Sequence, residues 1–180
     1  SLYLTTLGSS TSEAFDQICD SPHFLLMTSF AAQSFTAGLT GDLIRFDYGN
    51  FGGPQFPLEV RLYQGDGTGG TQLGSWTLTP VWSDGWFQLE LSPSAPLTSG
   101  QQYTMWIQGM MPLEMLHSSG DPYAGGKLHG FGDDAMDIKF RTLMRVAGSG
   151  SETMGRLYSN GNDLYWNGAQ LTSSGELNAP

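Results

Sequence analysis

Four aspartates in the last third of the chain have the chemistry to hold a metal ion. Asp133, Asp134 and Asp137 cluster together, and Asp121 lies shortly before them. Carboxylate and carbonyl oxygens are the ligands that Ca²⁺ takes, roughly six to eight at a time. We therefore expect a calcium ion at these four aspartates, with a solvated acidic turn as the competing interpretation. Asp66, in the run GDGTGG, is a weaker candidate, because those glycines more simply permit a positive φ in a hairpin.

Two aromatic residues have the surroundings of a sugar platform. A flat ring complements the apolar face of a pyranose, and nearby polar groups bind the hydroxyls. Trp82 stands beside Ser83-Asp84, and Tyr123 lies in the run DPYAGG. We expect any glycan to contact Trp82 and Tyr123. The tryptophans within apolar strand patterns are interpreted as core residues, namely Trp76, Trp86 and Trp106.

Catalytic patterns are missing from the sequence. No Gly-x-Ser-x-Gly motif occurs, and the three histidines have no metal-binding spacing: His23, His117 and His129. Glu90 and Glu114 are the one carboxylate pair considered for glycoside hydrolysis. Glu90 alternates with Leu89 and Leu91, which places it on the solvent face of a strand. We assign no catalytic residue and expect a non-enzymatic protein.

The elements that position these residues are mainly strands. Eight short segments alternate apolar and polar residues and are separated by turn residues such as Ser83-Asp84-Gly85. They cover residues 24–30, 33–37, 42–48, 58–64, 72–78, 86–91, 102–108 and 136–144. Their spacing predicts an all-β protein with two packed antiparallel sheets, and eight is the jelly-roll number.

Two features interrupt this pattern. Ser10 and Glu13 form a capping box, and Pro22 provides a stop, so we expect one short helix over Ser12 to Cys19. A long loop is expected from Gly109 to Gly132. Cys19 is the only cysteine, so it is either buried or paired between chains, and its apolar neighbours favour burial.

Composition excludes two classes of partner. The formal net charge is −10 and only seven residues are basic, so the chain has no basic stripe for nucleic acid. No apolar run reaches the length of about 18 residues needed for a membrane span. A start at Ser1 without an initiator Met favours a mature extracellular product secreted through a cleaved signal peptide.

Several stretches resemble a jelly-roll β-sandwich module of secreted and surface-attached bacterial proteins. They are QSFTAGLTGDLIRF, LYQGDGTGGTQLGS, GWFQLELSPSAPLTSGQQYTMWI and DPYAGGKLHG with DIKFRT, which together cover roughly residues 33–142. The resemblance implies an adhesive, carbohydrate-binding or structural role outside the cell. The tail LYSNGNDLYWNGAQL is similar to short hairpins of phage tail fibres, and its Asn160-Gly161 and Asn167-Gly168 pairs are strong turn signals.

The two ends of the chain suggest contacts between copies. We divide the chain into an N-terminal extension at 1–22, a sandwich at 23–147 and a C-terminal hairpin extension at 148–180. Detached strands with a good β pattern are what one subunit donates to the sheet edge of another. The expected contact residues are Leu2, Leu4, Leu7, Leu157, Tyr158, Tyr165 and Trp166. The function expected is therefore a self-assembling filament, fibre or surface layer, with a carbohydrate-binding or adhesive module as the alternative.

Overall fold

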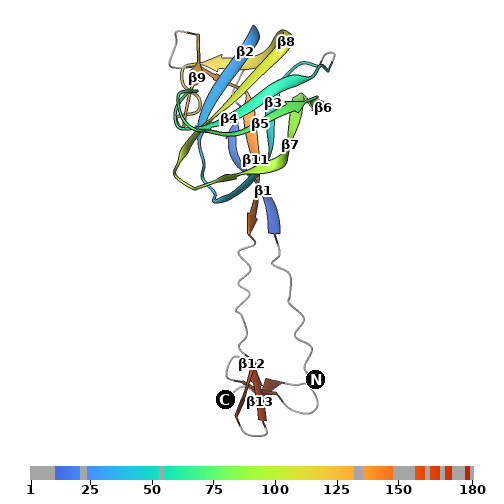
Figure 1. Cartoon of the computed structure of the whole chain (residues 1–180), viewed down its shortest axis with the longest axis vertical. Helices are drawn as coiled ribbons and strands as arrows, with labels where there is room; N and C mark the ends of the chain where they lie inside the picture. The colour runs from blue at the N-terminus through green and yellow to red at the C-terminus, as the bar shows by residue number, and fades with distance from the viewer. Residues whose placement is uncertain are drawn as a thin grey trace. The chain divides into compact units, whose positions relative to one another are not determined.

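The structure is a computed structural model in which the chain divides into two compact units. It describes residues 11–20, 24–52, 55–131 and 136–147, and the backbone of four short strands between residues 157 and 178. The first unit spans Thr11–Ala147, and the second combines Ser1–Ser10 with Gly148–Pro180. Every described regular element is a strand (Figure 1). Within these ranges no helix has the length and apolar character needed to cross a membrane.

The first unit contains two antiparallel sheets. The five-stranded sheet has the order β1-β11-β3-β7-β6, with β1 Thr11–Cys19, β11 Phe140–Ala147, β3 Gly41–Gly49, β7 Trp86–Leu97 and β6 Val81–Ser83. The six-stranded sheet has the order β5-β4-β8-β2-β9, with β5 Gln72–Leu78, β4 Leu58–Gln64, β8 Gln102–Ser119, β2 Phe24–Thr36 and β9 Leu128–His129, while β10 Met136–Ile138 pairs with β8. The predicted all-β class with two antiparallel sheets is confirmed.

One hydrophobic core joins the two sheets. Phe35 of β2 contacts the rings of Phe46 on β3, Phe140 on β11 and Tyr103 on β8. These side chains come from both sheets and are buried, so the inner faces pack against each other in a sandwich-like arrangement.

The alternation of apolar and polar residues explains why the strands form. In β4 the inward positions Leu58, Val60 and Leu62 are buried and the residues between them face outward.

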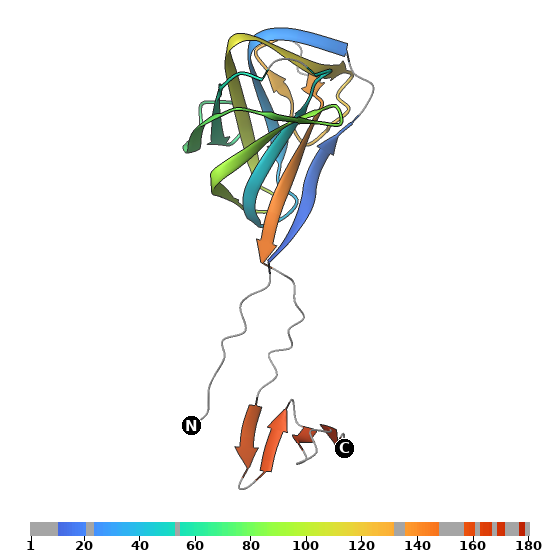
Figure 2. The ribbon, with the colours of Figure 1, turned by 90° about the vertical axis from the view of Figure 1, so that its right-hand side faces the viewer.

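The helix expected over Ser12 to Cys19 is wrong, because this segment is strand β1. It pairs antiparallel with β11, from Thr11 opposite Ala147 to Cys19 opposite Phe140. Figure 2 shows the two strands side by side. A helix of this length gains little stability in water, whereas pairing satisfies the edge of β11 and buries Cys19. Within the predicted N-terminal extension at 1–22, residues 11–19 form β1, the outer strand of the five-stranded sheet.

The long loop expected from Gly109 to Gly132 is also wrong over half of its length. Strand β8 continues to Ser119 and pairs with β2 on both sides of an irregularity. Gln108 lies opposite Phe30 and Leu113 opposite Thr28, so the residues from Gly109 to Pro112 form a bulge. Pro and Gly are tolerated at such a position, where the ladder is interrupted.

The second unit contains a four-stranded antiparallel sheet. Its order is β12-β13-β14-β15, with β12 Leu157–Asn160, β13 Asp163–Trp166, β14 Ala169–Leu171 and β15 Leu177–Asn178. Trp166 pairs with Ala169, which places Asn167-Gly168 between β13 and β14. Asn160 pairs with Asp163, so the first connection lies one residue later than its Asn160-Gly161 signal.

Candidate functional site

The predicted calcium ligands are only partly described. Asp133 and Asp134 lie outside the described residues, and Asp121 is exposed, with a φ of 53°. Asp137 is fully buried on β10, where its Oδ1 accepts a hydrogen bond of 2.7 Å from the Gln33 amide and its Oδ2 accepts one of 3.2 Å from the Tyr123 N–H. No group of three His, Cys, Asp or Glu side chains within the described ranges is arranged to hold a metal ion. The calcium site stays a prediction.

Asp137 has a structural role that the sequence did not indicate. Burial raises the pKa of its carboxyl above the ordinary value, opposed by the hydrogen bonds from Gln33 and Tyr123 and reinforced by the negative charge of Asp121. The Gln33 side chain also accepts a hydrogen bond of 2.9 Å from the Ile138 N–H. The buried Gln33 and Asp137 pair therefore ties β2 to β10 and to the Tyr123 loop.

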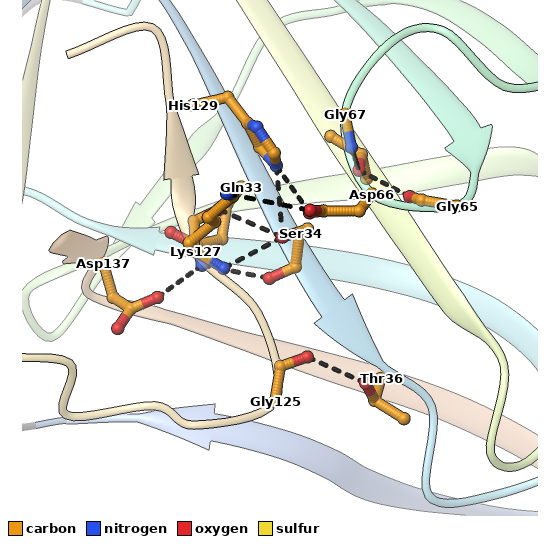
Figure 3. A network of polar contacts seen from close by, with 11 residues as sticks. Gln33, Ser34, Thr36, Gly65, Asp66, Gly67, Gly125, Lys127, His129 and Asp137 are labelled. Carbon is orange, nitrogen blue, oxygen red and sulfur yellow. Dashed lines mark hydrogen bonds and ion pairs between the residues drawn. The ribbon is translucent and has the colours of Figure 1, made fainter. Parts of the chain in front are cut away.

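Hydroxyl groups of β2 hold the segment from Gly125 to Lys127 against the sandwich. Ser34 Oγ accepts a hydrogen bond of 2.9 Å from the Lys127 N–H and donates one of 3.2 Å to the Lys127 carbonyl. Thr36 Oγ1 donates 2.8 Å to the Gly125 carbonyl (Figure 3). The segment is thus held by two residues of one strand.

A second loop is fixed beside this segment by a buried threonine. Thr104 Oγ1 accepts a hydrogen bond of 2.7 Å from the Gly67 N–H and donates one of 2.8 Å to the Gly65 carbonyl. Gly65 and Gly67 have φ values of 96° and 88°, which confirms that these glycines permit positive φ. The result is a rigid turn that presents Asp66.

Asp66, His129 and Ser34 lie together in Figure 3, but they do not form a catalytic relay. His129 Nε2 is 2.8 Å from Asp66 Oδ1 and 3.2 Å from Ser34 Oγ. A relay needs the carboxylate on one ring nitrogen and the hydroxyl on the other. Here both partners meet the same nitrogen, and Ser34 is fully buried. The group therefore fastens β9 to β2 and to the Asp66 turn.

These two loops border an open polar cleft at one end of the sandwich. It has a volume of about 400 Å³ and is lined by Thr36, Asp66, Gly100, Gln102, Ala124, Gly125, Gly126 and Lys127. Lys127 Nζ lies 3.9 Å from Asp66 Oδ2, so the cleft is lined by a pair of opposite charges. Sequence reasoning missed this cleft, because its lining comes from four separate segments.

The structure separates the two predicted sugar platforms. Trp82 is exposed on β6, at the edge of the five-stranded sheet opposite β1. Tyr123 is half-buried: its ring packs edge-on against Phe140, and its hydroxyl donates a hydrogen bond of 2.8 Å to Gln17 on β1. Burial raises the pKa of Tyr123 to about 12. Trp82 and Tyr123 therefore do not form one platform.

The other residues singled out from the sequence have mixed positions. Trp76 and Trp86 are buried, as expected for core residues, whereas Trp106 is half-buried with the Arg61 guanidinium 4.7 Å from its ring centroid. Glu90 is exposed, as expected, and lies 3.5 Å from Arg45. His117 contacts the Phe24 ring. His23 lies outside the described residues.

Apolar side chains are exposed along one edge of the six-stranded sheet. From Phe24 to Ala31, β2 pairs with β8 on one side, and no other described strand pairs with this stretch. Large exposed side chains lie along it, namely Phe24, Leu25, Met27 and Phe30. The whole of β2 contains no charged residue. Within the described chain this is an open, uncharged sheet edge.

The predicted contact residues of the two ends are described unequally. Leu2, Leu4 and Leu7 lie outside the described residues. In the second unit the backbone of Leu157 pairs with that of Trp166, and Tyr158 pairs with Tyr165. The four C-terminal contact residues are therefore two cross-strand pairs of one hairpin.

No protein-family model, curated protein or solved structure matches this chain.

Proposed function

We propose that this protein is a non-enzymatic extracellular structural subunit that assembles with copies of itself into a filament, fibre or surface layer. The observation that carries the proposal is the open, uncharged edge of β2 from Phe24 to Ala31. An unpaired edge offers a row of N–H and C=O groups to a strand from another chain.

A jelly-roll arrangement of the sandwich is part of the proposal. Strand order supports it: β1, β11, β3 and β7 lie in one sheet, and β2, β8, β4 and β5 lie in the other. Along the chain, β1, β2, β3 and β4 alternate between the sheets, as do β7, β8 and β11. This interleaving is typical of a jelly roll.

The β2 edge lacks two of the features that prevent association, charges and prolines. Natural edge strands are protected by charges, prolines or bulges that turn the edge away. In β2 one irregularity lies between Thr28 and Phe30, but the strand has neither a charge nor a proline. Covering a large apolar side chain such as Met27 stabilises a complex by roughly 1.5–3 kcal/mol. The edge therefore favours an added strand.

The first residues of a neighbouring copy are the proposed strand. Ser1 to Leu7, SLYLTTL, is uncharged like β2 and alternates Leu2 and Leu4 with Tyr3. Extended, this segment spans roughly 23 Å, which is close to the length of the edge from Phe24 to Ala31. The donated strand gains backbone hydrogen bonds along its length and buries its leucine side chains. Together these offset the entropy that is lost when a short segment becomes ordered.

A charge on the edge tests this proposal. Met27→Lys places an ammonium at an exposed β2 position, and Met110→Lys, at a bulge residue that is 95% exposed, is the matched control. We expect wild type and Met110→Lys to form larger species as concentration rises in analytical ultracentrifugation, whereas Met27→Lys stays monomeric with an unchanged circular dichroism spectrum. A wild-type protein that is monomeric at every concentration would refute the proposal.

A further inference from the structure

The polar cleft beside Asp66 has the geometry of a prepared binding site. Its lining residues come from the end of β2, the loop after β4, the start of β8 and the segment before β9. Its volume of about 400 Å³ falls within the range of roughly 300–1,000 Å³ typical of small-molecule sites. The cleft lies wholly within the Thr11–Ala147 unit.

Asp66 is held in place before any ligand arrives. Thr104 bonds the backbone on both sides of it, and Gly65 also donates a hydrogen bond of 2.7 Å to the Gln102 carbonyl. His129 holds one carboxylate oxygen at 2.8 Å. The other oxygen, Oδ2, is 3.9 Å from Lys127 Nζ, which is too long for a direct hydrogen bond. Asp66 therefore lines the cleft in a fixed position, with Oδ2 in a loose ion pair with Lys127.

The opposite wall is equally well supported. A side chain at Gly126 would collide with the Ser34 carbonyl, so glycine allows this segment to lie directly on β2. Thr36 holds the Gly125 carbonyl, and its own N–H donates to the Tyr123 hydroxyl at 3.2 Å. Tyr123, expected to be a sugar platform, instead supports this wall from behind.

The polar groups of the cleft match hydroxyls better than other chemistries. Asp66 supplies an acceptor, Lys127 a donor, and the Gln102 side-chain amide, which bonds no other described residue, supplies both. Each sugar hydroxyl both donates and accepts. An anionic ligand would be repelled by Asp66 and by the net charge of −10, and a cationic ligand would be repelled by Lys127. The paired charges therefore favour a neutral ligand.

We propose that this cleft binds a neutral glycan, with Asp66, Gln102 and Lys127 as the contacting side chains. The site is separate from the β2 edge, so binding does not require assembly. Loss of one hydrogen bond between the ligand and a charged side chain weakens binding about tenfold.

Nuclear magnetic resonance titration tests the site. The probes are methyl β-glucoside, methyl β-galactoside and methyl α-mannoside at millimolar concentration, added to the Met27→Lys protein so that assembly does not interfere. We expect at least one probe to shift the amide signals of Gly65, Gly67, Gly100 and Gly125. Asp66→Asn should weaken that probe about tenfold.

Two further variants complete the design. Asp84→Asn is the matched control, because Asp84 also precedes a glycine in a turn and lies outside the cleft. Gln102→Ala removes a side chain that bonds no described residue, so it tests the cleft even where Asp66→Asn fails to fold. The proposal would be overturned if no probe shifted any signal, or if the shifts were confined to the Trp82 region. It would also be overturned if Asp84→Asn weakened binding as much as Asp66→Asn, or if Gln102→Ala did not weaken it. Equally tight binding of methyl glucuronide would overturn it as well.

Discussion

The carboxylate of Asp47 lies 2.6 Å from Nε of Arg141, although only 1% of the Asp47 side chain is exposed. The second carboxylate oxygen is 2.9 Å from Nε of Arg45. The Arg141 guanidinium is 4.6 Å from the ring centroid of Phe15 and 4.4 Å from that of Trp86. Two arginines and two rings therefore shield one carboxylate on the outer face of the five-stranded sheet, and they connect β1, β11, β3 and β7.

Neutralising this carboxylate should destabilise the fold. Asp47→Asn removes the buried charge that Arg141 and Arg45 share, and Arg45 then keeps only the exposed Glu90 at 3.5 Å. The expected loss in the free energy of unfolding is about 2–4 kcal/mol. Urea denaturation measures it. Glu59→Gln is the control, because the Glu59 pair with Arg61 at 3.0 Å is exposed, and it should leave the midpoint unchanged. Equal midpoints for the two variants would contradict the structural role of Asp47.

The buried carboxyl of Asp137 should give a pH dependence of unusual sign. Burial raises its native pKa above the ordinary 3.8, so its contribution to stability is present below 3.8 and is lost as the pH rises through the native pKa. The stability of wild type relative to Asp137→Asn should therefore increase as the pH falls from about 7 to about 4. Urea denaturation of both proteins across this range measures the difference. A difference that shrinks on acidification would contradict the raised pKa.

Most strands could be predicted from the sequence because alternation and turn residues act locally. The segments at 58–64 and 72–78 coincide with β4 and β5. The segments at 24–30 and 33–37 are one strand, β2, except for Ala37, and that at 136–144 is divided between β10 and β11. Whether two segments form one continuous strand depends on the strand that pairs with them. The alternation of apolar and polar residues does not reveal which strand that is.

The errors occurred where tertiary contacts overrode local signals. The capping box at Ser10 and Glu13 is a valid helix signal, but the free edge of β11 and the Arg141 guanidinium over Phe15 favour a strand. Gly109 and Pro112 suggested a loop, yet both fit in a bulge of β8.

The polar cleft was outside the reach of sequence reasoning. Ser34 meets Lys127 across 93 positions, and Gly67 meets Thr104 across 37. A serine in an alternating strand predicts an outward side chain, whereas Ser34 is fully buried beneath the Lys127 segment. The glycines around Asp66 were the one local sequence signal of the cleft. They indicated the turn at Asp66 but not the residues that contact it.

Calcium should stabilise the protein if the predicted aspartate cluster binds it. A ligand that binds only the native state stabilises it by mass action, by about 2.7 kcal/mol at a hundredfold excess over Kd. We expect added CaCl2 to raise the melting temperature, a chelator to reverse the rise, and Asp121→Asn to reduce it. Differential scanning fluorimetry measures all three. An unchanged melting curve in protein stripped of metal would show that the cluster is a solvated turn.

Removing residues 1–9 should separate assembly from folding. The compact unit begins at Thr11 and contains the hydrophobic core of the described residues, so the truncated protein should keep its melting temperature. It also loses Leu2, Leu4 and Leu7, the proposed donors to the β2 edge, so it should no longer form larger species in analytical ultracentrifugation. Removing residues 148–180 tests in the same way whether Leu157, Tyr158, Tyr165 and Trp166 contribute. A lower melting temperature with unchanged association would mean that the first residues pack on their own chain, and the strand-donation mechanism would be wrong.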